Sequence, residues 1–330
     1  MTSVRPQRRA ILRRVLPSPV VRVLLAARRS WRDLNERLFP TPGPNAFPLA
    51  LPTPPTRAVR AARLRALSWL PKRALTAVCV DVPPSLYVGG VLRRSGLRGY
   101  EPGAISCFLA LLDTTRCRLA FDVGANLGLY TLVGTALTRA RIVAFEPEPT
   151  VAGALAWTTR LNGLAADAEA VAVGDHNGVA TLYISDTTDA SNSLNPAFRD
   201  AVGTVDVPLV TLDAYCQRTR RWPGLLKIDT ETTEPAVLRG ASQVLGRRPI
   251  ILCEVLPGGA GAEIEAILRP LGYHWFQIEE TLPPRAQDGI VGHESMEATN
   301  WVFLPTAPPP ALWENALEWR RRIEEIPAWR

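Results

Sequence analysis

The sequence predicts an α/β fold with a mostly parallel sheet, helices on its flanks and an inserted antiparallel hairpin. Short apolar runs of strand length alternate with segments that carry apolar residues at helical spacing. Several of the runs end in an acidic residue, and Asn177-Gly178 has the composition of a hairpin turn. In a parallel sheet the carboxyl ends of the strands meet at one edge, and ligands bind there.

A glycine turn follows the clearest of these strands. Residues 119–123 are apolar except for Asp122, and Gly124 and Gly128 then interrupt the run before a helical pattern begins. Gly124 allows a sharp turn and close approach of the backbone to a ligand. Asn126 can cap the helix, whose free N–H groups favour negative charge. The pattern indicates a nucleotide-binding strand, turn and helix.

The acids around this turn indicate which cofactor it suits. The next predicted strand, residues 140–145, ends at Glu146, where an acid can hold the two hydroxyls of a ribose. The glycine spacing is not the G-x-G-x-x-G of dinucleotide folds, and Asp122 would repel a pyrophosphate. S-adenosylmethionine has no phosphate, and its amino and sulfonium groups tolerate an acid. The alternative is an ordinary glycine turn inside an α/β sheet.

Four acids lie at predicted strand ends: Asp122, Glu146, Asp229 and Glu254. Four acids at one sheet edge suggest a site for hydroxyls or cations. Asp229, Glu231 and Glu254 have the oxygen ligands for one Mg²⁺. No ligand spacing requires a metal ion, and we predict no metal site.

The formal charge of +7 is concentrated near the N-terminus, which is crowded with arginine. Residues 20–31 can form a basic amphipathic helix on anionic lipid, with a solvated tail as the alternative. The basic residues do not stripe the core, and no N/D-P-P-[FYW] motif follows the fourth strand, so we expect no nucleic-acid partner. We expect peripheral membrane contact, if any, through this N-terminus.

Cysteine usage and hydropathy bear on the compartment. The five cysteines form no C-x-x-C pair, which is typical of buried thiols in a reducing cytoplasm. No apolar stretch approaches the roughly 20 residues of a transmembrane helix. The preference for arginine over lysine, with abundant alanine and proline, is typical of a GC-rich bacterial genome. The sequence therefore predicts a cytoplasmic bacterial protein.

Short segments between Tyr100 and Glu254 resemble, in order, the motifs of the FkbM-type methyltransferases, and weaker similarity extends to Leu304. This family consists of S-adenosylmethionine-dependent O-methyltransferases with the class I Rossmann-like fold, whose sheet is of the seven-stranded type. The matching segments are Tyr100-Glu-Pro102, Phe121-Asp-Val-Gly-Ala-Asn-Leu-Gly128, Phe145-Glu-Pro147, Ala172-Val-Gly-Asp175, Thr211-Leu-Asp213, and Leu226-Lys-Ile-Asp229 with Glu231 and Glu234.

The resemblance implies S-adenosylmethionine as the cofactor. The glycine turn would line its methionine end, Glu146 would hold the ribose, and the segment ending at Asp175 would lie near the adenine. The implied cofactor-binding residues are Asp122, Gly124, Asn126, Gly128, Glu146 and Asp175.

Asp229 and Glu231 would face the methyl-transfer region. Asp229 is the first candidate for the catalytic base and Glu231 the second. Lys227 lies two residues before Asp229, on the same side of the strand, where it can keep an acid ionised. The alternative for Asp229 is a structural role in capping the next turn.

One position departs from the family pattern. The family resembles Asp-x-Glu-Gly-x-Glu, whereas this chain has Asp229-Thr-Glu-Thr-Thr-Glu234, so that Thr232 replaces a glycine. A β-branched residue disfavours φ > 0 and fills space that a glycine leaves open. We therefore expect an altered loop shape beside the substrate.

The predicted organisation has four parts. Residues 1–45 form a basic, poorly ordered tail, and residues 46–99 a proline-rich arm and N-terminal β/α extension, in which residues 75–82 and 86–88 are paired strands. Residues 100–305 form the class I methyltransferase domain. Residues 306–330 carry a C-terminal amphipathic helix.

The predicted function is methyl transfer from S-adenosylmethionine to a hydroxyl of a sugar, glycolipid or secondary metabolite, as in enzymes of the EC 2.1.1 class. The serine and asparagine side chains of residues 185–195 can bind such an acceptor, with a solvated loop as the alternative. A non-catalytic binding protein of the same fold is a second reading, supported by Thr232. A nicotinamide-dependent oxidoreductase is a third, and the missing G-x-G-x-x-G motif argues against it.

Overall fold

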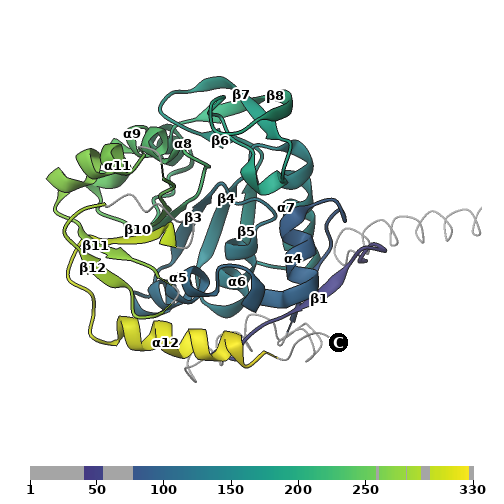
Figure 1. The fold of residues 1–330 in the computed structure, drawn as a ribbon, viewed down its shortest axis with the longest axis horizontal. Helices are drawn as coiled ribbons and strands as arrows, with labels where there is room; N and C mark the ends of the chain where they lie inside the picture. Colours follow the sequence, from purple (N-terminus) through teal and green to yellow (C-terminus); the bar gives the residue numbers. More distant parts are fainter. Residues whose placement is uncertain (1–40, 55–76, 258–259, 280, 291–297, 327–330) are drawn as a thin grey trace, which may run out of the picture. The chain divides into compact units, whose positions relative to one another are not determined.

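The described strands form one large sheet and two small ones (Figure 1). The computed structural model describes residues 41–54, 77–257, 260–279, 281–290 and 298–326. All the strands and helices below lie within Pro44–Arg330, which is a unit separate from Met1–Gly43. The predicted amphipathic helix at 20–31 and nearly all of the predicted basic tail lie outside the described residues. No helix in the described ranges is long and apolar enough to cross a membrane.

Eight strands make the large sheet. They are β3 (Leu119–Val123), β4 (Arg141–Phe145), β5 (Ala166–Glu169), β9 (Leu225–Ile228), β10 (Ile250–Glu254), β11 (His274–Gln277), β12 (Arg285–Gln287) and β13 (Asn300–Leu304). Their order is β12-β11-β13-β10-β9-β3-β4-β5. The strands from β10 to β5 pair in parallel, whereas β13 runs antiparallel between β10 and β11. The predicted α/β fold class with a mostly parallel sheet is confirmed.

Helices cover both faces of this sheet (Figure 1). One layer contains α4 (Tyr87–Ser95), α5 (Pro102–Thr114), α6 (Leu129–Leu137), α7 (Pro149–Leu161) and α12 (Ala311–Glu324). The other contains α8 (Leu212–Thr219), α9 (Glu234–Arg239), α10 (Ser242–Gly246) and α11 (Ala260–Leu268). Each layer closes its own apolar core against the sheet, one around Phe108 and the other around Phe121.

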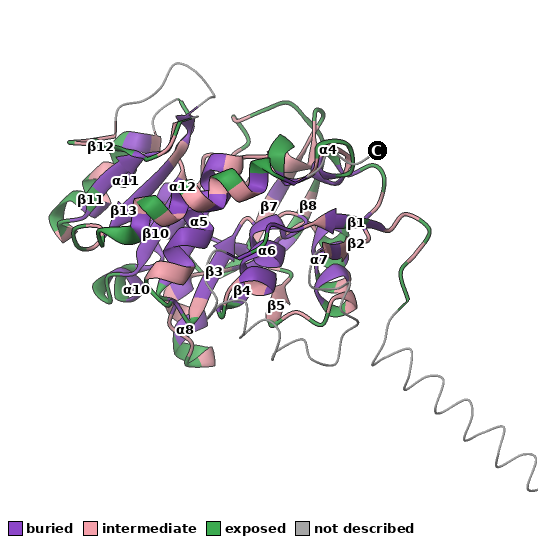
Figure 2. Cartoon of the chain, turned by 90° about the horizontal axis from the view of Figure 1, so that it is seen from below, coloured by how far each residue is buried: buried purple, intermediate pink, exposed green. Residues whose placement is uncertain are grey.

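The last described helix, α12, packs beside α5 (Figure 2). Its apolar residues recur at helical spacing, and all four members of the stripe are buried: Leu312, Ala316, Trp319 and Ile323. The amide of Asn315 donates a hydrogen bond to the hydroxyl of Thr114 at the end of α5, at 3.0 Å. The amphipathic helix predicted near the C-terminus is therefore an integral part of one helical layer.

A three-stranded sheet lies beside the carboxyl ends of the large sheet, at the top of Figure 1. It contains β6 (Ala172–Val173), β7 (Gly178–Ser185) and β8 (Ala201–Val210) in the order β6-β8-β7. The Asn177-Gly178 turn was expected to join a hairpin of residues 168–173 and 179–184, but this pairing is wrong, because β6 and β7 both pair with β8, and β7 does so antiparallel. The side chain of Asn177 accepts a hydrogen bond from the backbone N–H of Thr211, which holds this turn against the end of β8.

A short antiparallel pair joins β1 (Phe47–Ala50) to β2 (Ala77–Val80). The prediction that residues 86–88 pair with this second strand is wrong, because they begin α4. The proline-rich segment supplies the partner strand instead, and burial of Val88 and Leu92 on one face favours the helix.

Candidate active site

A cavity opens at the carboxyl ends of β3, β4 and β9. Its lining also includes β6, part of β7, and residues 189, 190 and 192–194. Five of the predicted site residues line it: Gly124, Asn126, Glu146, Asp229 and Glu231. The structure thus brings the glycine turn, the predicted ribose acid and both candidate bases to one cavity.

Gly124 is where two turns of the site touch. Its φ is +74°, and a Cβ atom built on it would lie 1.7 Å from the carbonyl oxygen of Asp229. Its N–H and that of Ala125 both donate to the carbonyl of Phe145, at 3.0 Å. Only glycine fits here, because the backbone after β9 occupies the place of a side chain.

Gly128 lies outside the lining and serves packing. Its φ is +84°, and an added Cβ atom would lie 2.9 Å from the side chain of Leu155 on α7. This glycine therefore lets the start of α6 approach α7 closely.

Glu146 is held by backbone N–H groups on both oxygens. Oε2 accepts from Asn126 at 2.8 Å, and Oε1 accepts from Glu148 at 2.9 Å. Burial raises the pKa of Glu146 to about 7, against the lowering effect of these two donors. Each oxygen keeps a further lone pair, so the carboxylate can still accept hydrogen bonds from two hydroxyls.

Asp122 reaches the first turn of α6 and not the cavity. It is fully buried, and its Oδ2 accepts from the backbone N–H of Thr131 at 3.1 Å and from its hydroxyl at 2.7 Å. An acid at this position also suits the positive end of the helix dipole. Burial raises the pKa of Asp122.

Asp175 is exposed and also lies outside the lining. Its carboxylate pairs with His176 at 2.9 Å and with Arg239 at 3.3 Å, and the hydrogen bond from His176 is the main cause of its lowered pKa. Of the segment predicted to lie near the adenine, Ala172 and Val173 line the cavity.

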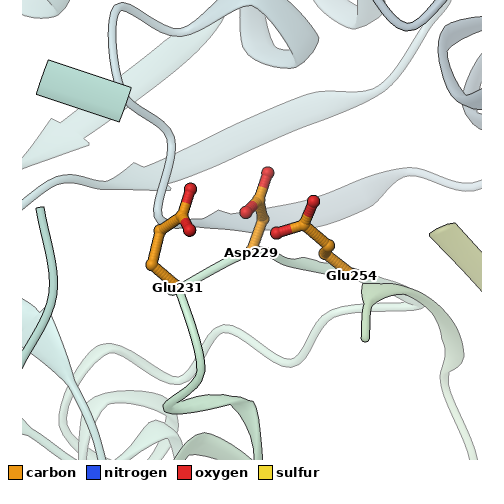
Figure 3. A group of neighbouring side chains, drawn as sticks. All are labelled: Asp229, Glu231 and Glu254. Atoms are coloured by element: carbon orange, nitrogen blue, oxygen red, sulfur yellow. The ribbon is translucent and has the colours of Figure 1, made fainter. Parts of the chain in front are cut away.

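Three carboxyl groups meet beside the cavity (Figure 3), and two of them, those of Asp229 and Glu231, belong to its lining. Those of Asp229, Glu231 and Glu254 point the same way, and each offers an oxygen within 4.8 Å of the others. Asp229 follows β9, and Glu254 ends the adjacent strand β10. The cluster thus follows from the alignment of parallel strand ends that the sequence predicts.

Lys227 pairs with Asp229, as expected from their spacing. Its Nζ lies 2.8 Å from Oδ2 of Asp229 and 4.7 Å from the ring centroid of Tyr130. Burial opposes the charge of Lys227, but Asp229 and the nearby acids Asp122 and Glu101 raise its pKa. The ion pair holds the carboxyl group of Asp229 beside Lys227.

The pKa values of the other two carboxyls of the cluster are raised. Burial first, and then the negative charges of Asp229 and Glu234, raise the pKa of Glu231 to about 9. Burial and Asp229 raise the pKa of Glu254 well above its ordinary value. Of the two candidate bases, Asp229 has a lysine counter-ion, whereas the raised pKa of Glu231 favours its neutral form.

Sequence reasoning assigned no role to Glu101, although it lies in the matching segment at 100–102. Its Oε2 accepts from the hydroxyl of Tyr130 at 2.7 Å, and its charge contributes to the raised pKa of Lys227. Its φ of 42° is unusual for a residue other than glycine. The motif match was the only sequence signal for a role of Glu101. The sequence does not show that the starts of α5 and α6 bring Glu101 and Tyr130 close to Lys227.

Comparison with known proteins identifies a family and distant structural similarities. Residues 122–275 match the methyltransferase FkbM domain. The fold is similar to an O-methyltransferase from Bacillus cereus in complex with SAH, with 12% identity over 76% of this chain and 90% of that chain and a TM-score of 0.36. A putative O-methyltransferase from Klebsiella pneumoniae has 10% identity over 74% of this chain and 96% of that chain, with a TM-score of 0.38. A SAM-dependent methyltransferase from Agrobacterium tumefaciens has 10% identity over 61% of each chain, with a TM-score of 0.37. The search of curated proteins found no match.

Proposed function

Because the chain belongs, through residues 122–275, to the methyltransferase FkbM domain family, we propose that it transfers a methyl group from S-adenosylmethionine to a hydroxyl of a sugar, glycolipid or secondary metabolite. One observation carries the proposal. A single cavity is lined by Glu146, which can take a ribose, and by Asp229, an ion-paired carboxylate that can take a proton. The cofactor and the acceptor can therefore meet beside a base.

The residues of the cavity fit S-adenosylmethionine better than a pyrophosphate cofactor. Glu146 keeps lone pairs for two hydroxyls while its position is fixed by Asn126 and Glu148. The carboxyl oxygens of Asp229 and Glu231 in the lining can face a sulfonium. When bound, S-adenosylmethionine supplies the methyl group and a good leaving group.

Asp229 is the residue that we assign as the base. Asp229 would accept the proton of the acceptor hydroxyl, while S-adenosylmethionine would supply the methyl group to the hydroxyl oxygen and leave as S-adenosylhomocysteine. Lys227 positions Asp229 through the ion pair, and a neutral Glu231 can donate a hydrogen bond to another oxygen of the acceptor. A positioned base contributes about 10²–10⁴-fold, and orientation of the two reactants up to about 7–11 kcal/mol.

Calorimetric titration with S-adenosylhomocysteine tests the cofactor. We expect binding to the wild type, loss of binding in Glu146→Ala, and no binding of NADH. Glu263→Ala is the matched control, because this exposed glutamate lies on α11 away from the cavity lining. Binding of NADH in place of S-adenosylhomocysteine would overturn the proposal in favour of an oxidoreductase.

Transfer of a labelled methyl group tests the reaction. The acceptors are a panel of methyl glycosides, glycerol and catechol, and the product is identified by mass spectrometry. Transfer to oxygen supports the proposal. Binding of S-adenosylhomocysteine without transfer to any acceptor would favour a non-catalytic binding protein. Transfer of the methyl group to an atom other than oxygen would overturn the proposal of O-methylation.

A further inference from the structure

Residues 189–195, which we call the strap, run along the cavity from the glycine turn to the turn that follows β9. We call these the cofactor end and the acceptor end, after the proposed function. The strap begins with the single turn Asp189–Ser191, and its residues 189, 190 and 192–194 belong to the lining. In the middle, Ser193 exchanges two backbone hydrogen bonds with Tyr183 of β7, at 2.9 and 3.2 Å. The strap is therefore a wall of the cavity with defined attachments.

The cofactor end of the strap is attached to the glycine turn. The amide of Asn126 donates to the carboxylate of Asp189 at 3.2 Å. A second carboxylate oxygen of Asp189 accepts from the backbone N–H of Tyr87, at the start of α4. This end is held independently of the acid cluster.

The acceptor end is attached to the turn that follows β9. The hydroxyl of Ser193 donates to the carbonyl of Glu231 at 2.6 Å, and the amide of Asn195 donates to the hydroxyl of Thr232 at 2.9 Å. Neither Asn195 nor Thr232 belongs to the cavity lining, whereas Ser193 and Glu231 do. The outer pair thus stands behind the residues that an acceptor would contact.

Thr232 adopts a backbone conformation that threonine disfavours. Its φ is 81°, and that of Glu231 before it is 56°. The carboxylate of Glu234 accepts from the backbone N–H groups of Thr230 and Thr232, at 2.8 and 3.2 Å, and so holds the turn in this shape. Glycine would adopt the same φ without strain. What threonine adds is a hydroxyl, and that hydroxyl is bonded to the strap.

We propose that Asn195 and Thr232 are positioning residues that pin the acceptor end of the strap against Glu231 and so fix the width of the acceptor pocket. The threonine replaces the glycine of the family pattern, and the contact to Asn195 needs its hydroxyl. This proposal rests on the proposed function in one respect, namely that the pocket beside Glu231 binds the acceptor. The attachment itself can be measured without turnover.

The test compares three substitutions at one position by hydrogen–deuterium exchange, read by mass spectrometry on peptides that cover residues 191–195. Thr232→Val keeps the shape and removes the hydroxyl, Thr232→Gly removes both the hydroxyl and the strain, and Thr232→Ser keeps the hydroxyl. Thr219→Val, which removes a hydroxyl bonded within α8, is the matched control. Exchange is measured with and without S-adenosylhomocysteine.

Loss of one hydrogen bond should speed exchange in the strap about three- to tenfold. We expect this change in Thr232→Val and Thr232→Gly, and wild-type exchange in Thr232→Ser and Thr219→Val. The affinity for S-adenosylhomocysteine should stay within about twofold in all four, because Asn126 holds the cofactor end. Wild-type exchange in Thr232→Val, or failure of serine to retain it, would overturn the proposal.

Failure of the wild type to bind S-adenosylhomocysteine would instead overturn the proposed function. The exchange of the strap without ligand would still report whether Thr232 holds it. Asn195→Ala provides a second route to the same contact. Asn195→Ala also removes the acceptor of the Ala197 N–H, so the informative comparison is with the double variant. Adding Thr232→Val to Asn195→Ala should change exchange little further, because the Asn195–Thr232 bond is already lost.

Discussion

Lys227 and Asp229 form an ion pair at the base of the cavity, with Nζ 2.8 Å from Oδ2 and side chains only 4% and 19% exposed. The register of β3 and β9 also sets Asp122 opposite Lys227. An ammonium group removed from water needs such neighbours, because burial alone disfavours its charge. The lysine is therefore both a buried part of the fold and the counter-ion of the candidate base.

Replacement of this lysine should be costly. Lys227→Met leaves Asp229 buried without its counter-ion, and we expect a loss of about 3–5 kcal/mol in the free energy of unfolding, measured by urea denaturation. The double variant with Asp229→Asn should recover part of the loss. The exposed Arg218→Met is the control. An equal effect of the two single methionine variants would contradict this account.

The two candidate bases should differ in their effect on turnover. Asp229→Asn should lower the rate of methyl transfer about 10²–10⁴-fold, because asparagine cannot take the proton. Glu231→Gln should lower it less than about tenfold, because a neutral carboxyl and an amide can both donate a hydrogen bond. Single-turnover measurements with bound S-adenosylmethionine separate chemistry from release. The reverse ranking would assign the base to Glu231.

Stability should fall as pH rises from about 5 to about 9. Folded Glu231 keeps its proton up to a pKa of about 9, whereas the ordinary value is 4.5. Between these values the unfolded chain binds fewer protons than the folded one, so the free energy of unfolding decreases with pH. Urea midpoints at pH 5, 7 and 9 measure the slope.

Glu231→Gln should make that slope shallower, because glutamine does not titrate. The exposed Glu263→Gln should leave it unchanged. An identical slope in Glu231→Gln and the wild type would show that Glu231 loses its proton equally easily in both states.

Two glycine-to-alanine substitutions should have opposite effects. Gly124→Ala introduces about 1–3 kcal/mol of backbone strain and drives the turn away from Asp229, whose carbonyl occupies the place of the new methyl group. Gly153→Ala, within α7, meets no atom within 4 Å and should stabilise by about 0.5–1 kcal/mol. Thermal unfolding measures both. Equal destabilisation would contradict the close contact at Gly124.

The sequence was sufficient to predict the arrangement of the acidic strand ends. Apolar runs that end in Glu146, Asp229 and Glu254 become adjacent parallel strands around β3, so their acids share one edge of the sheet. This inference needs only the apolar runs in the sequence and the rule that ligands bind at the carboxyl ends of parallel strands. Neither requires knowledge of contacts between residues far apart in the chain.

Side-chain direction was beyond the sequence. Asp122 stands at the predicted strand end but turns towards Thr131, because the start of α6 offers two donors there. Asp175 turns outward to His176 and Arg239. Each direction depends on which donors lie within reach of the carboxylate in the folded chain, and the hydrophobic periodicity of the sequence does not encode that.

The strap was also beyond prediction. A polar run at 185–195 is typical of a solvated loop, and only the fold brings Ser193 and Asn195 to the turn after β9. We expected Thr232 to alter the shape of its loop by avoiding a positive φ. Instead, the turn keeps the positive φ that glycine would favour.

The position of β13 between β10 and β11 has a consequence for synthesis of the protein. Residues 300–304 fill the gap between two strands that precede them, and α12 then covers α5. While these residues are still inside the ribosome, the nascent chain presents an open edge of β10, whose last residue is Glu254. Premature termination near residue 299 should therefore yield an aggregation-prone chain and not a smaller enzyme.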